Sequence, residues 1–395
     1  MTRQEPLSRI SLRFSANLHA QVGKPLPEPA ETVVKISKVP GYFFKVLPNG
    51  RYVSYIGRDS NVLLDLQTGT ETPLVGSMDP VWTPDGRFLT TPDSGKMAVY
   101  PADSLIANTL AGVKPEAQKV AMDGVYQSIG KTENSYQMVT DNDGLSIASL
   151  DENFNLTSPV HKACQNVANF PTNLPMLSKD GRYLSVYDDE SKSTKIFNLE
   201  GDSCSLAVDL GFPTGKVSFN ADSSQIAFHV DQFGDFDQGY FSGVGKDKVK
   251  NVMVLKLDQG PTGKTLIPNS WAMASRVTKS GDGGFYPDFD AAGNLYFMED
   301  QDNFFQIVKT VPSRLEWRPM DENTLYDCVN CESNPEAPLS ALAKMWASVC
   351  PNGIPLERAP FLADAINPVD CRSMVNQLWT PELSIPKDKL LRSCP

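Results

Sequence analysis

A short phrase built around an Asp-Gly turn recurs along this chain and constrains its fold more than any other feature. The clearest copy is Pro80-Val-Trp-Thr-Pro-Asp-Gly-Arg-Phe-Leu89, in which two apolar strand segments flank the turn. Gly86 can adopt the positive φ that a tight hairpin turn requires. The phrase therefore predicts a β-hairpin at each place where it occurs.

Copies of the phrase turn near residues 50, 86, 131, 181, 223 and 293, with one long insertion after Phe228. The spacing of roughly 36 to 50 residues, with about four short strands in each unit, is typical of a β-propeller. Apolar residues alternate or run in short blocks, which disfavours helical repeats. We predict an all-β fold in which residues 31–318 form a six-bladed β-propeller after an irregular arm, residues 1–30.

Two details of this propeller follow from the order of the strands. In the second unit we expect a closing strand near Ala107–Leu110. The segment Glu31-Thr-Val-Val-Lys-Ile36 precedes the first unit as Glu71-Thr-Pro-Leu-Val75 precedes the second. We expect the former to complete the last blade and close the ring, which removes an exposed edge. Leu315-Glu-Trp-Arg318 is the rival for that place.

The repeated phrase resembles that of TolB-like six-bladed propellers. The best matches are Trp82–Leu89 and Leu177–Leu184, and weaker copies lie at 47–53, 219–226 and 289–295. The resemblance implies the fold and little about function, because such propellers serve as periplasmic binding modules, as domains beside hydrolases and as enzymes. In this interpretation Asp85 and Asp180 are turn formers.

The net charge and the cysteine content limit the kinds of partner and the cellular compartment that we expect for this protein. The formal charge of −11 argues against nucleic acid or an anionic membrane as partner, and no apolar run is long enough to span a membrane. Five of the seven cysteines lie between residues 328 and 394, a density typical of disulfide-stapled modules in oxidising compartments. We therefore expect a periplasmic or secreted protein whose leader was removed, with a cytosolic protein as the alternative. The odd number leaves one thiol without a partner in the chain.

Residues 319–395 are predicted to form a small disulfide-rich α-helical module. Its Cys328-Val-Asn-Cys331 segment is faintly similar to a degenerate cytochrome c domain, but Glu332 stands where the axial His would be, so we expect no haem. A Zn²⁺ site and a redox-active Cys328–Cys331 pair are the alternatives to disulfides. Cys164 and Cys204 occupy matching places in units three and four, and we expect a structural disulfide between them. The disulfide candidates are Cys164, Cys204, Cys328, Cys331, Cys350, Cys371 and Cys394.

The insertion at residues 231–250 is the longest irregular stretch between the repeats, and long loops on rigid scaffolds often carry function. Its acidic residues suit Ca²⁺, whereas its aromatic residues suit a protein contact, and a solvated acidic loop without function is the third interpretation. The candidate binding residues are Asp231, Phe233, Asp235, Phe236, Asp237, Tyr240 and Phe241.

Catalytic signals are sparse. His19, His161 and His229 are the three histidines, and no Gly-x-Ser-x-Gly elbow occurs. We therefore predict a non-catalytic extracytoplasmic scaffold, without a required cofactor, that binds a protein or cell-envelope component through loops on one face or at the channel mouth. The alternatives are a metal-assisted hydrolase or lactonase in the channel and a redox protein that uses the Cys-x-x-Cys pair.

Overall fold

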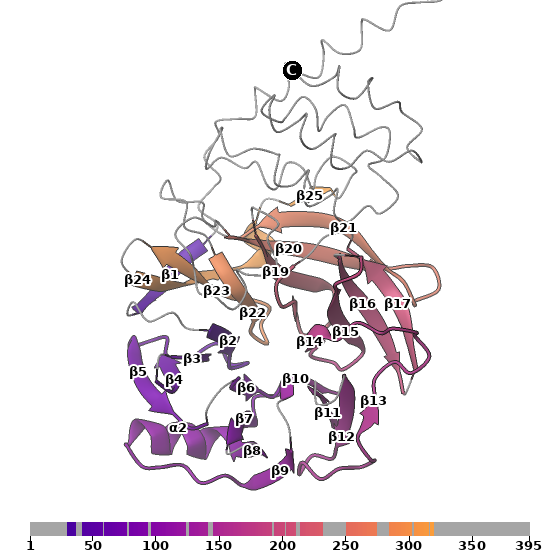
Figure 1. The fold of residues 1–395 in the computed structure, drawn as a ribbon. Coiled ribbons are helices and arrows are strands. Elements are labelled where there is room, and N and C mark those ends of the chain that lie inside the picture. Colours follow the sequence, from indigo (N-terminus) through magenta and orange to yellow (C-terminus); the bar gives the residue numbers. More distant parts are fainter. Residues whose placement is uncertain are drawn as a thin grey trace, which may run out of the picture.

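The protein forms a ring of six antiparallel sheets around a central channel (Figure 1). This computed structural model describes residues 30–36, 42–57, 59–76, 79–93, 96–123, 126–140, 145–191, 193–201, 203–210, 214–231, 250–274, 284–301, 304–315 and 317–319. The predicted all-β six-bladed propeller is confirmed. The predicted C-terminal helical module, residues 319–395, lies outside the described residues except for Pro319, which ends a strand.

Each blade is a sheet whose first strand lines the channel. Blade one comprises β2 (Tyr42–Val46), β3 (Tyr52–Ile56), β4 (Asn61–Asp65) and β5 (Thr70–Leu74). Blade two comprises β6 (Val81–Trp82), β7 (Phe88–Asp93), β8 (Lys96–Pro101) and β9 (Lys119–Asp123). Blade three comprises β10 (Tyr126–Lys131), β11 (Tyr136–Thr140), β12 (Ser146–Leu150) and β13 (His161–Lys162). Blade four comprises β14 (Asn173–Leu177), β15 (Tyr183–Asp188), β16 (Ser193–Glu200) and β17 (Ser203–Asp209). Blade five comprises β18 (Ser218–Phe219), β19 (Gln225–Asp231), β20 (Lys250–Gln259), β21 (Leu266–Met273) and β25 (Arg318–Pro319). Blade six comprises β22 (Gly284–Phe289), β23 (Leu295–Gln301), β24 (Phe304–Thr310) and β1 (Ala30–Ile36).

The predicted turns connect the first two strands of the blades. Four of these turns carry a glycine with a φ between 71° and 77°, a region that residues with a side chain rarely adopt. These glycines are Gly50, Gly86, Gly181 and Gly293. Blade five has Ser223 at this place, with a φ of 60°.

The prediction of a closing strand near Ala107–Leu110 was wrong. That segment belongs to helix α2 (Ala102–Leu110), and β9 is the outer strand of blade two. Ala102, Leu105 and Thr109 are its buried residues, and their spacing of three and four places them on one helical face. A helix that packs one apolar face against the blade needs no strand partner. No helix in the described ranges is long and apolar enough to cross a membrane.

The N-terminal strand closes the ring. β1 pairs with β24 from Ala30 opposite Thr310 to Ile36 opposite Phe305, with one irregularity between Thr32 and Val34. This confirms the predicted closure. The rival segment does not complete blade six, because Arg318 and Pro319 pair with β21 and extend blade five.

Apolar side chains fill the spaces between neighbouring blades, which is why no blade can bury its faces alone. The cluster between blades six and one contains buried residues of both sheets: Phe44, Val53, Leu64, Phe285, Met298 and Ile307. The cluster between blades one and two is built in the same way from Leu47, Leu63, Trp82, Leu89 and Ala98. Each interface therefore depends on two sheets, and the whole core depends on closure of the ring.

Removal of β1 tests this dependence. A chain that begins at residue 37 exposes the edge of β24, and we expect a lower unfolding temperature and self-association through that edge. A chain that begins at residue 30 keeps β1 and is the matched control. Thermal unfolding and size-exclusion chromatography measure both effects. Equal unfolding temperatures for the two truncated chains would contradict the proposed role of β1.

Candidate functional site

The turns that follow the six channel-lining strands all lie at one end of the channel. We call this end the turn face; it comprises residues 47–51, 83–87, 132–135, 178–182, 220–224 and 290–294. β19 runs antiparallel to β18, so Asp231 at the end of β19 lies toward the opposite end of the channel. The turn face and the flanks of the predicted binding loop are therefore at different ends of the ring.

Aspartates of the repeated turns also join neighbouring blades. Asp85 Oδ1 accepts a hydrogen bond from Thr83 within its own turn, at 2.7 Å, and Asp85 Oδ2 accepts one from the Tyr136 hydroxyl of blade three, also at 2.7 Å. Asp180 repeats the arrangement, because it accepts from Ser178 at 2.6 Å and from Ser223 of blade five at 3.0 Å. The sequence showed the turn role of these carboxylates and missed their role between blades.

These contacts shift the pKa values of the groups involved. Burial raises the pKa of Tyr136, and the hydrogen bond to Asp85 raises it further. Burial alone would raise the pKa of Asp180, but hydrogen bonds from Ser178 and Arg182 outweigh it and lower the pKa. The tie between blades two and three therefore joins a protonated phenol and a carboxyl group.

Hydrogen bonds join neighbouring blades at every junction, so both hydrogen bonds and the apolar core hold the ring together. At the junctions not yet described, the donor and acceptor pairs are Ser54 Oγ and Pro80 O, Lys131 N and Lys179 O, Ser218 Oγ and Asp288 Oδ1, and Ala291 N and Pro48 O.

Tyr136→Phe removes one such tie while it keeps the ring and its packing. We expect the free energy of unfolding to fall by about 1–2 kcal/mol, because a partly buried hydrogen bond to a carboxylate is lost. Tyr52→Phe is the control, since the buried Tyr52 makes no side-chain hydrogen bond within the described residues. Urea unfolding measures both variants. An equal loss in the two would show that the Tyr136 hydroxyl contributes nothing to the junction.

Asp288 is the centre of a charged cluster inside the channel. Its Oδ2 accepts a hydrogen bond from Val46 N at 2.9 Å, and its Oδ1 accepts one from Ser218 Oγ at 2.7 Å. The Nζ atoms of Lys179 and Lys45 lie 3.7 Å and 4.0 Å from Oδ1, and Lys179 also donates to Phe289 O. The cluster thus joins blades one, four, five and six across the channel.

The cluster is buried, and this changes the pKa values of its members. The exposed fractions of the Asp288 and Lys45 side chains are 5% and 13%. Burial lowers the pKa of Lys45, an effect that Asp288 and Asp79 oppose and Lys179 reinforces. For Asp288, burial would raise the pKa, but Lys179 and Lys45 outweigh it and lower the value. Asp288 is therefore a carboxylate at neutral pH.

The hollow beside this cluster is small. Its volume is about 40 Å³, and its lining includes Lys45, Lys179, Asp288, Trp82 and Ser128. On this measure, which counts the space open to the centre of a water molecule, one water needs about 10–15 Å³, whereas pockets for small-molecule ligands typically measure about 300–1,000 Å³. The hollow therefore suits a few waters or a single small chemical group.

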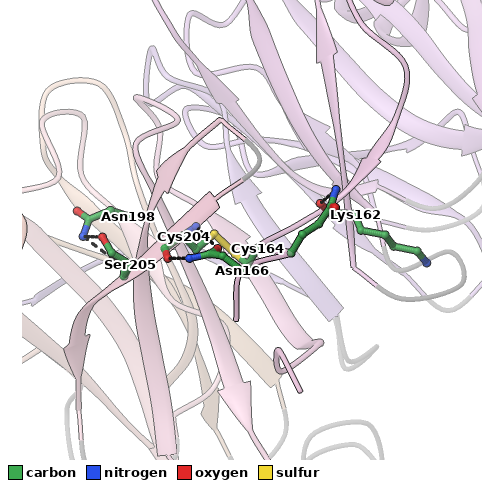
Figure 2. The surroundings of a disulfide bond; sticks show 7 residues. Lys162, Cys164, Asn166, Asn198, Cys204 and Ser205 are labelled. Carbon is green, nitrogen blue, oxygen red and sulfur yellow. Dashed lines mark hydrogen bonds between the residues drawn. A yellow bond between two sulfur atoms is a disulfide. The ribbon is translucent and has the colours of Figure 1, made fainter. Parts of the chain in front are cut away.

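Cys164 and Cys204 form the predicted disulfide between blades three and four (Figure 2). Their exposed fractions are 1% and 4%. Asn166 supports the bond from both sides, because its Nδ2 donates to Cys204 O at 2.8 Å and its Oδ1 accepts from Cys204 N at 2.7 Å. The disulfide is therefore buried structure rather than an exposed reactive group.

The other sequence-predicted site residues are not tested. Asp231 ends β19, where it pairs with Lys250. Phe233, Asp235, Phe236, Asp237, Tyr240 and Phe241 lie outside the described residues, as do Cys328, Cys331, Cys350, Cys371 and Cys394. His161 and His229 lie on different blades, and the described ranges contain no group of three or more His, Cys, Asp or Glu side chains placed to hold a metal ion.

Sequence reasoning missed the channel cluster, although a signal was present. Lys45, Ser218 and Asp288 each occupy the penultimate position of a channel-lining strand. Equivalent positions of different blades meet around the axis, so opposite charges in this register indicate a channel contact. The signal is readable only after the blades have been aligned.

No family model matches this chain, and no curated protein sequence matches it either. Among solved structures, the chain is similar to the β-propeller domain of Cps50 (Swd1) from Myceliophteria thermophila, with 12% identity, a TM-score of 0.40, and coverage of 71% of this chain and 99% of that chain. It is also similar to a putative TolB from Agrobacterium tumefaciens, with 14% identity, a TM-score of 0.40, and coverage of 69% and 91%. Likeness this distant carries no functional argument, and the blade count rests on the strand order.

Asp288→Asn tests the channel cluster. We expect the free energy of unfolding at pH 7 to fall by about 3–5 kcal/mol, because two buried lysines lose their carboxylate. A lowered pKa means that the stabilising contribution of Asp288 is present above about pH 3.9, the ordinary pKa of Asp, and is lost as the pH falls below that value. The unfolding free energies of wild type and variant should therefore converge in acid.

Glu200→Gln is the control for this variant, because Glu200 pairs with Lys264 on the exposed rim. We expect it to change the free energy of unfolding by less than about 1 kcal/mol. Urea titrations between pH 2.5 and pH 7 measure the three proteins. A constant difference between wild type and Asp288→Asn across this range would contradict the ionised state assigned to Asp288.

Proposed function

We propose that this protein is a non-catalytic propeller scaffold that works outside the cytoplasm and binds a protein or cell-envelope component through its turn face and channel mouth. The observation that carries the proposal is the charged cluster in the channel. Asp288 is held there by two lysines, a hydroxyl and a backbone N–H. A carboxylate committed to four partners is a poor general base or metal ligand, and the adjoining hollow is too small for a typical substrate.

The rigidity of the turn face supports the same function. Its turns are fixed by side-chain hydrogen bonds within the turn and by ties to the next blade, such as those of Asp85 and Asp180. Surface residues held in fixed positions lose little conformational entropy when a partner binds. The exposed residues available for contact include Asn49, Glu133 and Asp222. The predicted loop 231–250 and residues 319–395 are further candidate surfaces, and the proposed function requires no cofactor.

Site-specific photo-crosslinking tests the binding function. A photoreactive residue at position 49, 133 or 222 should yield a discrete adduct in cells of the source organism, because these positions lie on the turn face. The same residue at position 206, where Leu206 is exposed on the outer strand β17, is the matched control and should yield none. Equal adducts at all four positions, or metal-dependent ester or lactone hydrolysis by the purified protein, would contradict the proposal.

The proposed compartment rests on the buried disulfide. Disulfides persist in oxidising compartments and are rare in the cytosol. If cells are lysed in the presence of an alkylating agent, peptide mass mapping should recover Cys164 joined to Cys204 and unalkylated. Alkylation of both thiols under denaturing lysis would show that the protein resides in a reducing compartment.

A further inference from the structure

The channel hollow contains more hydrogen-bond donors than the described residues satisfy. Lys45 Nζ donates no hydrogen bond there, since its ion pair with Asp288 spans 4.0 Å and its further partners are the more weakly interacting Asp79 and the Phe43 ring at 5.6 Å. The Ser128 hydroxyl accepts a hydrogen bond from Leu177 N at 2.8 Å, but it donates to no described acceptor. The buried Trp82 Nε1 also lacks a partner in the described chain.

Asp288 does not satisfy these donors. Its Oδ2 accepts from Val46 N and its Oδ1 from Ser218, whereas Lys45 Nζ lies 4.0 Å from Oδ1, beyond hydrogen-bond distance. Two ammonium groups face this one carboxylate, and Asp79 is a further, weaker electrostatic partner of Lys45 that gives it no hydrogen bond. A buried ammonium without a hydrogen-bonded partner is costly, and an ionised acceptor forms the strongest hydrogen bonds with it.

The size of the hollow limits the acceptor that would fit. About 40 Å³ has room for a group of two or three heavy atoms and not for a whole metabolite. We propose that the hollow binds a single carboxylate group, with Lys45 as its principal cation and Ser128 as a second donor. The carboxylate could come from a small free acid or from an acidic side chain of a bound partner. The second source rests on the proposed binding function.

Formate is the probe, because it is a carboxylate with three heavy atoms. With formate replacing chloride at constant ionic strength, we expect a saturable rise in the unfolding temperature of the full chain. Lys45→Met should weaken formate binding about tenfold or more, since a hydrogen bond to a charged group is lost. Lys264→Met, which removes a rim lysine with 64% of its side chain exposed, is the control and should leave the rise unchanged.

Ser128→Ala provides a second, milder variant should Lys45→Met fail to fold. We expect about threefold weaker formate binding from the loss of one neutral donor. Absence of a saturable rise in the wild type, or an equal rise in the wild type and the variant of the hollow that folds, would overturn the proposal and show a general salt effect only.

Peptides distinguish the two sources of the carboxylate. If the acid belongs to a partner, acetyl-Gly-Glu-Gly-amide should compete with formate and acetyl-Gly-Gln-Gly-amide should not. If neither competes while formate still binds, the site takes a small free acid. Failure of formate binding would remove this site without affecting the crosslinking result, and failure of crosslinking would remove the scaffold function without affecting formate binding.

Discussion

The structure depends on one constraint: each small sheet has two faces to bury and cannot bury either without a neighbouring sheet. The buried clusters are shared between blades, so each blade completes the core of the next. A ring is the arrangement in which every blade has two neighbours, and β1 closes it by pairing with β24. Because chain ends that are far apart in sequence form one blade, stability of the last blade depends on the N-terminal strand.

Hydrogen bonds and ion pairs between blades add to this apolar core by fixing how the blades are aligned. The Asp-Gly turn fixes a hairpin, and the same carboxylate then accepts a hydrogen bond from the next blade, as with Asp85 and Tyr136. At the axis, Asp288 of blade six faces Lys45 of the adjacent blade one and Lys179 of blade four, which is not adjacent. These contacts fix the turn face around a hollow lined by charged side chains, and this link between ring closure and surface chemistry supports the proposed function.

The sequence was sufficient for the fold because the repeat is local: turn glycines and strand alternation are visible within each unit. It predicted ring closure by residues 31–36 and the Cys164–Cys204 pair, since both follow from the order of the units. It failed at α2, where residues 107–110 read as a strand although the buried positions have helical spacing. It missed Lys45 and Asp288 because a contact between residues 243 positions apart depends on the register of the first and last blades, which meet only when the ring closes.

The central claim is that the ring opens as one unit, since every blade shares its core and its hydrogen bonds with two neighbours. Native-state hydrogen exchange of the unmodified protein, followed by mass spectrometry in increasing urea, tests this claim most directly. The account predicts that amides of the second strands, β3, β7, β11, β15, β19 and β23, converge on one opening free energy. A lower opening free energy confined to blade six, with the other blades still protected, would contradict it.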